Sequence, residues 1–305
     1  MRFSIIIPSF ARPKPLHRCL AGLAALDYPR DRFEVIVVDD GNPDPLDEIV
    51  REFDGHLRIT LVRQANSGPA IARNAGAQHA RGEWLGFIDD DCVAHPDWLA
   101  QIDDAAAKWP EAMLSGDTVN ACSGNVFAEL NQILVSTVTR WLKEHDSALH
   151  FFPSNNLFCP AASFQRIGGF HPDFRIAAAE DREICARWLA SGGEMVEVPE
   201  ARISHSHPQT LTTFLRMHFR YGRGAATLHR SRNTSPRQFA TRGLHTALLR
   251  ATLREDSASR RVVLPVLMCA AQAAEAAGYI FESLGRSRAA AFFESSRDAQ
   301  NEPNA

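Results

Sequence analysis

The chain has 305 residues, of which 45% are hydrophobic and 23% charged, so it can bury one substantial core, with or without an appendage. Its six cysteines include no CxxC pair, which argues against a zinc ribbon or a disulfide framework and fits a reducing cytoplasm. The apolar run in MRFSIIIPSF is too short for a signal peptide, and we expect it to be the first strand of the fold.

The formal charge of -3 is distributed unevenly along the chain. Residues 216–261 contain eleven arginines, no lysine and two acids, a net charge of +9 that leaves -12 for the remainder. The sequence therefore predicts an acidic body with a basic C-terminal region. We expect no nucleic-acid partner.

Short apolar runs alternate with helical patterns over the first hundred residues. This series predicts an α/β fold, with a mostly parallel sheet covered by helices on both faces. In such sheets, ligands bind beyond the carboxyl ends of the strands. In chain order, we expect a strand at 3–10, a helix at 15–26, strands at 33–41 and 58–64, a helix at 69–80 and a strand at 84–88.

Polar clusters follow the predicted strands at the ends where a ligand would bind. Ser9 and Arg12 follow the first strand, Asp39 and Asp40 follow the second, and an aspartate triplet at 89–91 follows the fourth. No strand is followed by a glycine-rich phosphate-binding motif. We therefore expect phosphates to be held through a divalent cation, Mg²⁺ or Mn²⁺, that carboxylates bind.

The aspartate triplet is the strongest candidate for that cation site. Residues two apart in an extended segment point the same way, so we expect Asp89 and Asp91 to face the crevice while Asp90 turns aside. The alternative is a solvated turn that binds no ligand.

Five segments carry a resemblance to a known family. In order and approximate spacing, SIIIPSFARP, VIVVDDGN, SGPAIARNAGAQHARGEWLGFIDDD, IGGFHPDF and AEDREICARWLASGG resemble family 2 glycosyltransferases of the GT-A fold, over about two-thirds of the chain. The resemblance implies a Rossmann-like nucleotide-binding domain at 1–208. After Pro208 the residue pattern changes, and we expect a helical, arginine-rich extension at 209–305. It also implies inverting transfer of a sugar from a nucleotide-diphosphate donor, with a divalent metal bound through a D-x-D motif.

The resemblance also assigns roles to individual residues. It implies that Asp39 accepts a hydrogen bond from the nucleotide base, that Asp89 contacts the ribose and that Asp91 binds the metal. A further metal ligand is expected in ARISHSHP, where His205 is preferred to His207. The residues that the resemblance places around the nucleotide sugar are Pro8, Ser9, Arg12, Asp39, Arg73, Asn74, Asp89 and Asp90. The alternative for Arg73 is that it pairs with one of the aspartates.

An inverting displacement needs a carboxylate that removes the proton of the attacking hydroxyl. Glu180 and Asp181 follow a loop-like stretch and begin a predicted helix, where acidic side chains are favoured in any protein. Capping of that helix is therefore the alternative reading of both residues. The family pattern makes Asp181 the base and Glu180 a ligand of the acceptor or of a sugar hydroxyl.

The helical stretch that follows the ARISHSHP segment carries Arg216, Arg220 and Arg223 on one side. This row could contact the diphosphate or an anionic acceptor, or it could be a solvated basic face. Gly222 and Gly224 are expected to interrupt the helix and to form a hinge over the site.

An apolar, alanine-rich stretch at 262–284 follows two arginines. Pro265, Gln272 and Glu275 argue against a membrane-spanning helix, although the length would nearly suffice. A packed or interfacial helix is the better interpretation. The open alternatives are a peripheral contact with the anionic inner face of the cell membrane and a contact within a homodimer.

The predicted function is inverting transfer of a sugar to a hydroxyl acceptor, a glycan or a lipid-linked cell-envelope intermediate. One alternative is a sugar-nucleotide nucleotidyltransferase, which usually has a glycine-rich basic first loop that is absent from PSFARPKP. The other is a non-catalytic protein that binds nucleotide sugars, against which the combination of Asp89, Asp91 and Asp181 argues.

Overall fold

The computed structural model describes residues 1–146, 149–232, 242–254 and 258–298. The strands are β1 (Phe3–Ser9), β2 (Phe33–Asp39), β3 (Ile59–Arg63), β4 (Trp84–Ile88), β5 (Cys92–Ala94), β6 (Met113–Asn120), β7 (Asn156–Pro160) and β8 (Met195–His205). The helices are α1 (Pro13–Ala24), α2 (Asp47–Arg51), α3 (Pro69–His79), α4 (Trp98–Lys108), α5 (Val126–His145), α6 (Ala161–Arg166), α7 (Glu180–Ala190), α8 (Leu211–Ser231), α9 (Arg242–Leu253) and α10 (Ala258–Asp298).

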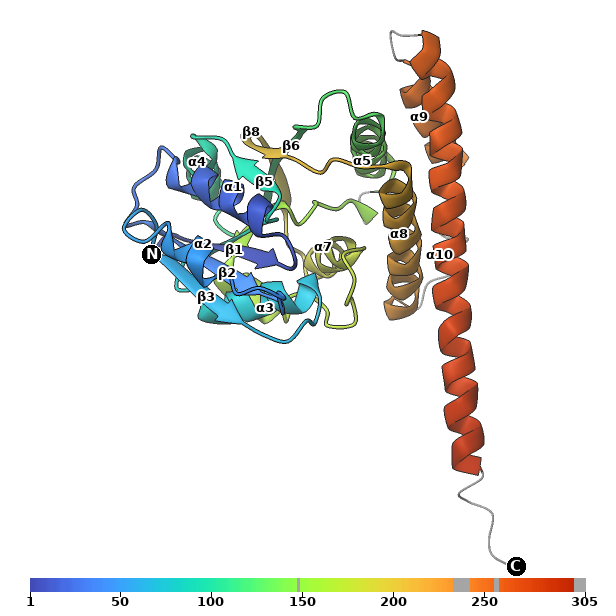
Figure 1. Cartoon of the computed structure of the whole chain (residues 1–305), viewed down its shortest axis with the longest axis horizontal. Coiled ribbons are helices and arrows are strands. Elements are labelled where there is room, and N and C mark those ends of the chain that lie inside the picture. The colour runs from blue at the N-terminus through green and yellow to red at the C-terminus, as the bar shows by residue number, and fades with distance from the viewer. Residues whose placement is uncertain (147–148, 233–241, 255–257, 299–305) are drawn as a thin grey trace, which may run out of the picture.

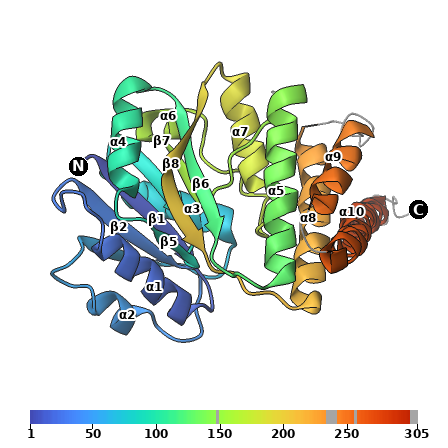
Figure 2. The same cartoon turned by 90° about the horizontal axis from the view of Figure 1, so that it is seen from above.

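The eight strands form one curled sheet in the order β3-β2-β1-β4-β7-β6-β8-β5 (Figures 1 and 2). The four predicted strands are β1 to β4, and they pair in parallel as expected. Beyond them the sheet is mixed, because β7 runs antiparallel between β4 and β6, and β5 runs antiparallel to β8. The fold is therefore α/β, as predicted, with a parallel half and a mixed half.

The central strands are apolar on both faces because helices cover both. In β1, Ile5 and Ile7 join one buried cluster with residues of α1 and α4, whereas Ile6 joins a second cluster with residues of α3 and α7. This alternation follows from the two-residue period of a strand. Burial on both sides explains the near-continuous apolar runs of β1, β2 and β4.

Helices α8, α9 and α10 lie on one flank of the body, beside α5 (Figures 1 and 2). A third apolar cluster joins them, and it includes Leu130 of α5, Phe214 of α8, Leu248 of α9 and Leu264 of α10. The C-terminal helices thus pack on the α/β body through a shared core.

The expected hinge in α8 is wrong, because the helix runs without interruption through Gly222 and Gly224. A β-carbon at Gly222 would collide with the carbonyl oxygen of Glu275 in α10, and one at Gly224 would collide with Ala178. Gly278 of α10 is placed in the same way against Phe219. These glycines allow close helix packing, which has the same sequence signature as a helix break.

Candidate active site

The carboxyl ends of β1, β2 and β4 meet at one edge of the sheet, where the polar clusters gather. The end of β8 reaches the same region because His205 contacts Asp91 in the acidic turn between β4 and β5. The start of α7 is linked to that turn through Arg73, which pairs with both Glu180 and Asp89. Its centre is the turn at 89–91, in which the amide of Cys92 donates to the carbonyl oxygen of Asp89 at 3.1 Å.

This turn corrects the expected orientation of Asp90. Because the backbone is not extended, side chains two apart do not share a direction, and each aspartate has its own partners. Asp90 is buried, accepts a 2.8 Å hydrogen bond from Ser9 Oγ and lies 3.4 Å from the Arg12 guanidinium. Burial raises the pKa of Asp90 to about 7, although the positive charge of Arg12 opposes that shift.

Asp91 is the centre of a carboxylate–histidine cluster. Pairing of β5 with β8 places Cys92 opposite His205, and the amide of Ser206 donates to the carbonyl oxygen of Asp91. His205 Nε2 lies 3.3 Å and His207 Nδ1 lies 3.2 Å from the two carboxylate oxygens of Asp91. The structure thus brings both candidate histidines to Asp91, and their nearly equal distances favour neither of them as the metal ligand.

Charge and burial shift the pKa values of Asp91 and His205 in opposite directions. Burial alone would raise the pKa of Asp91, but hydrogen bonds from His205 and His207 and the Arg12 charge, 2.6 Å away, hold it well below its ordinary value. Burial opposes protonation of His205, yet the Asp91 carboxylate raises its pKa. The cluster therefore attracts positive charge.

The same three side chains fit a divalent cation. One ligand atom from each of Asp91, His205 and His207 lies within 4.8 Å of the others. A carboxylate and two neutral imidazoles are ordinary ligands of divalent metals in proteins. This observation supports the expected class of cofactor.

Arg73 connects the acidic turn to the start of α7. Its side chain is only 3% exposed, and it donates to Asp89 at 2.7 Å and to Glu180 at 3.0 Å, with the ring of Phe170 5.5 Å from its guanidinium carbon. Its Nε has no hydrogen-bond partner within the described part of the chain. Pairing with an aspartate, the alternative reading for Arg73, is therefore present in the structure.

Glu180 and Asp181 form the first turn of α7. Burial raises the pKa of Glu180 to about 7 even though Arg73 favours its ionised form. Asp181 is half-buried and accepts a hydrogen bond from the amide of Arg182, and burial raises its pKa above the ordinary value as well. Ala179, just before them, has a left-handed φ of 68°, a strained backbone that often marks functional sites.

Asn42, which was not among the residues predicted from the sequence, holds the carboxyl end of β2 in place. Asp39 Oδ1 accepts hydrogen bonds from the backbone amide and the side-chain amide of Asn42, both at 2.8 Å. Asn42 also donates to the carbonyl oxygen of Ser9. An aspartate three residues before an asparagine in DDGN is the local signal for this turn.

Asp40 and Asn74 hold the backbone around the crevice. Asp40 accepts from the amides of Ser67 and Gly68 at 2.8 and 2.9 Å, which fixes the turn that enters α3. Both polar atoms of the Asn74 side chain bond to the backbone of Phe170. Asn74 was expected at the nucleotide, but here its amide is engaged in fixing the loop that precedes α7.

Two other expectations concern residues at the margins of the site. Pro8 lies in β1, whose last residue, Ser9, is opposite Asp39.

Arg223 donates to Glu282 of α10 at 2.9 Å, so it serves helix packing. Arg216 and Arg220 are exposed on α8, as the solvated reading of the arginine row predicts.

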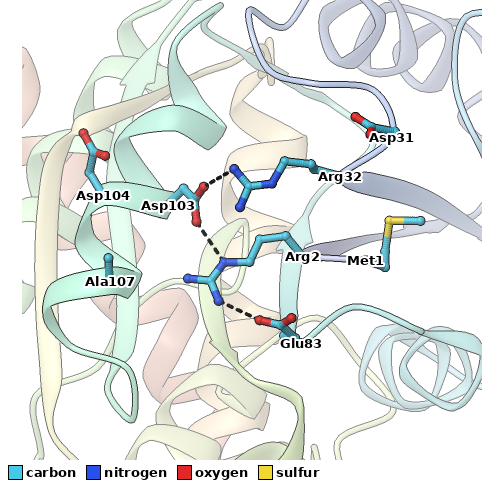
Figure 3. A pocket seen from close by; sticks show the side chains of 8 residues that line it. All are labelled: Met1, Arg2, Asp31, Arg32, Glu83, Asp103, Asp104 and Ala107. Atoms are coloured by element: carbon cyan, nitrogen blue, oxygen red, sulfur yellow. Dashed lines mark hydrogen bonds and ion pairs between the residues drawn. The ribbon is translucent and has the colours of Figure 1, made fainter.

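A cavity lined by charged residues lies elsewhere, at the amino ends of β1, β2 and β4. It measures about 510 Å³ and is lined by Arg2, Arg32, Glu83 and Asp103 among others (Figure 3). Arg2 pairs with both acids, and Arg32 pairs with Asp103. Because ligands of open α/β sheets bind at the opposite strand ends, this cavity is not the candidate active site.

The fold is that of the GT-A class of glycosyltransferases. Two solved structures share the fold. The mannosyltransferase PcManGT from Pyrobaculum calidifontis, in complex with GDP-Man and Mn²⁺, has a TM-score of 0.64 at 19% identity over 92% of this chain and 86% of that one. S. aureus TarS 1-349 in complex with UDP-GlcNAc has a TM-score of 0.55 at 17% identity over 94% and 92%.

The chain belongs to glycosyl transferase family 2, whose sequence profile matches residues 4–165. Validoxylamine A glucosyltransferase from Streptomyces hygroscopicus subsp. jinggangensis (strain 5008) is 30% identical over 68% of this chain and 58% of its own length. Pre-mycofactocin glycosyltransferase from Mycobacterium tuberculosis (strain ATCC 25618 / H37Rv) is 26% identical over 74% and 47%. The chain thus spans roughly half the length of these relatives. The predicted family and fold are confirmed.

Proposed function

We propose that this chain transfers a sugar, with inversion, from a nucleotide-diphosphate donor to a hydroxyl of a glycan or a lipid-linked cell-envelope intermediate. The observation that carries the proposal is the edge of the sheet where Asp91, two histidines and the Arg73-linked carboxylates converge. Residues 1–208 would form the catalytic domain and 209–305 the helical extension. We also propose a cytoplasmic location, which the six unpaired cysteines support.

The nucleotide would lie along the ends of β1 and β2. Asp39 is the proposed acceptor for the nucleotide base, next to Pro8, Ser9 and Arg12. Asp89 would contact the ribose from the acidic turn, where Asp90 is fixed by Ser9 and Arg12. Arg73 and Asn74 would shape this pocket from behind, through their bonds to Asp89 and Phe170.

Asp91 with His205 would bind the divalent cation, and His207 is placed equally well. When bound, the cation would neutralise negative charge on the donor diphosphate. The imidazole nitrogens favour Mn²⁺ over Mg²⁺, which prefers oxygen ligands and retains much of its water. The structural neighbour PcManGT was solved with GDP-Man and Mn²⁺, which supports this class of cofactor.

Asp181 is the proposed general base. The acceptor oxygen attacks the anomeric carbon, its proton passes to the Asp181 carboxylate, and the bond from that carbon to the diphosphate oxygen breaks with its electron pair. The raised pKa makes Asp181 a stronger base than an ordinary aspartate. Glu180, held by Arg73, would orient the helix end and an acceptor or sugar hydroxyl.

A donor screen tests this proposal. The purified chain is incubated with a panel of nucleotide sugars and Mn²⁺ or Mg²⁺, and release of nucleoside diphosphate is measured with and without acceptor. Donor turnover that requires a divalent cation supports the proposal. Release of pyrophosphate from a nucleoside triphosphate and a sugar phosphate would indicate a nucleotidyltransferase instead. Donor binding with no turnover for any acceptor would indicate a binding protein.

A further inference from the structure

The outward side of α10 is apolar and exposed. We call its large side chains the outer face, and they are Val262, Val263, Val266, Ile280, Phe281 and Leu284, each between 43% and 67% exposed. Between them lie Cys269, Ala273, Ala276 and Ala277, which are exposed as well. The stretch Ser259–Gly285 has the length and mean hydropathy, 1.4, of a helix that could cross a membrane, and 22% of its most apolar window is buried.

Three polar side chains in the described part of α10 contact the neighbouring helices α8 and α9. Glu275 accepts from His218 at 2.7 Å, Glu282 accepts from Arg223 at 2.9 Å, and Gln272 lies 3.2 Å from His245. A surface helix in water usually presents a polar face outward, whereas the outward side of α10 is apolar. The outer face is therefore suited to an apolar surrounding.

Among the residues that the structure describes, the exposed charges around the outer face have a single sign. Arg250 and Arg254 of α9 and Arg261 of α10 are exposed, and Leu249 and Leu253 add apolar surface beside them. Both acids that the structure describes between 243 and 285 are among the inward-facing contacts of α10. An apolar face rimmed by arginines is complementary to an anionic lipid surface. A symmetric dimer requires a self-complementary surface, and a face rimmed by charges of one sign is poorly self-complementary.

The helix is placed to lie on a bilayer rather than to cross it. α8 runs beside α10, and the backbones approach closely at Gly222 and Gly278. Crossing the bilayer would carry α8 into the hydrocarbon together with Arg216 and Arg220, which are exposed on it. A helix lying in the interface needs to bury only its outer face.

We propose that α9 and α10 dock this chain on an anionic bilayer surface, with the outer face in the lipid and the arginines at the headgroups. Only α8 would then separate the bilayer from the start of α7, because Gly224 contacts Ala178 on one side and Gly222 contacts Glu275 on the other. Docking itself does not depend on the proposed function. Its benefit, delivery of a lipid-linked acceptor to Asp181, rests on that function.

Vesicle flotation of the full chain tests the docking. The probes are vesicles of phosphatidylcholine alone and of phosphatidylcholine mixed with phosphatidylglycerol, each at low and high salt. We expect flotation with the anionic vesicles that weakens as salt rises. The variant Val266→Asp/Ile280→Asp should no longer float. Trp109→Asp, which alters an exposed apolar residue at the end of α4, should float like the parent.

The arginines and the folding of the variants provide further readouts. Arg250→Gln and Arg254→Gln should each weaken partitioning into anionic vesicles by about fivefold, the value expected for one arginine at the headgroups. Circular dichroism should be unchanged, because all five substituted side chains are exposed. Absence of flotation, equal flotation with neutral vesicles, or flotation of the Val266→Asp/Ile280→Asp variant would each overturn the proposal. A dimer in sedimentation that this variant alone converts to monomer, without flotation of the parent, would assign the outer face to a second copy.

Donor turnover with a soluble acceptor separates this inference from the proposed function. Val266→Asp/Ile280→Asp should retain that turnover and lose flotation. If the parent floats but turns over no donor, the proposed function fails and the docking stands.

Discussion

Two clusters of ion-paired arginines and carboxylates lie at opposite ends of the same parallel strands, and only at one end do the paired carboxylates outnumber the arginines. At the amino ends, Arg2 and Arg32 pair with two carboxylates, Asp103 and Glu83 (Figure 3). At the carboxyl ends, two arginines pair with four carboxylates. Arg12 contacts Asp90 and Asp91, while Arg73 contacts Asp89 and Glu180.

The pKa directions show what this difference means. Burial would raise the pKa of Asp103, but hydrogen bonds from Arg2 and Tyr28 lower it overall, as in a balanced ion-pair cluster. At the other end, burial raises the pKa of Asp90 and of Glu180 to about 7. A positively charged ligand would stabilise the ionised form of these buried carboxylates. Strongly shifted pKa values of this kind are typical of functional sites. The predictions below test whether only the carboxyl-end cluster is functional.

The largest effect is expected for the proposed base. Asp181→Asn should lower turnover by roughly 10²- to 10⁴-fold, the range for loss of a general base, while donor affinity stays close to that of the parent. Steady-state rates and calorimetric titration of the donor measure the two quantities. If Asp181 only caps α7, the variant would instead keep normal turnover and lose no more than about 1 kcal/mol of stability.

The next effect concerns the cation. Asp91→Asn should weaken metal-dependent binding of a nucleoside diphosphate by at least about 100-fold, because loss of an outer-shell partner alone commonly costs 10- to 100-fold. Titration calorimetry with and without Mn²⁺ measures it. Asp104→Asn, at the amino-end cavity, is the matched control and should bind like the parent. Equal losses in both variants would remove the distinction between the clusters.

Much of the parallel half could be predicted because its signals are local. The strands β1 to β4 follow from short apolar runs, and the acids follow directly after them. The pairing of β5 with β8 joins Cys92 to His205, and no local pattern announces that contact. The link from Arg73 to Glu180 is also long-range, so the sequence left Arg73 with two readings. The orientation of Asp90 was missed because three aspartates in a row do not reveal a turn.

A smaller effect is expected from the arginine that bridges the acidic turn and α7. Arg73→Lys keeps the charge but cannot donate from a planar fork to Asp89 and Glu180 at once. Slight misplacement of the catalytic groups should lower turnover by roughly 10- to 100-fold with a smaller change in KM. Arg32→Lys makes the same substitution in the amino-end cluster, and we expect normal kinetics. Kinetic loss in Arg32→Lys as large as in Arg73→Lys would argue against a bridging role.

The smallest effect is an opposite dependence of stability on pH at the two clusters. Glu180 has a folded-state pKa of about 7, above its unfolded value of ~4.3. The folded chain therefore binds more protons than the unfolded chain, and this contribution to stability declines as pH rises from ~4.3 toward about 7. Asp103 has a lowered pKa, so its contribution is present above ~3.9 and is lost as pH falls through its folded value.

Denaturant unfolding of three proteins across acidic to neutral pH separates these contributions. Relative to the parent, Glu180→Gln should flatten the decline toward neutral pH and leave the acid limb in place. Asp103→Asn should flatten the acid limb, leave the neutral limb in place and cost ~1–2 kcal/mol near neutral pH. If Glu180→Gln changed only the acid limb, Glu180 would be an ordinary balanced carboxylate. The excess of negative charge at the carboxyl ends would then have to reside in the aspartates of the acidic turn.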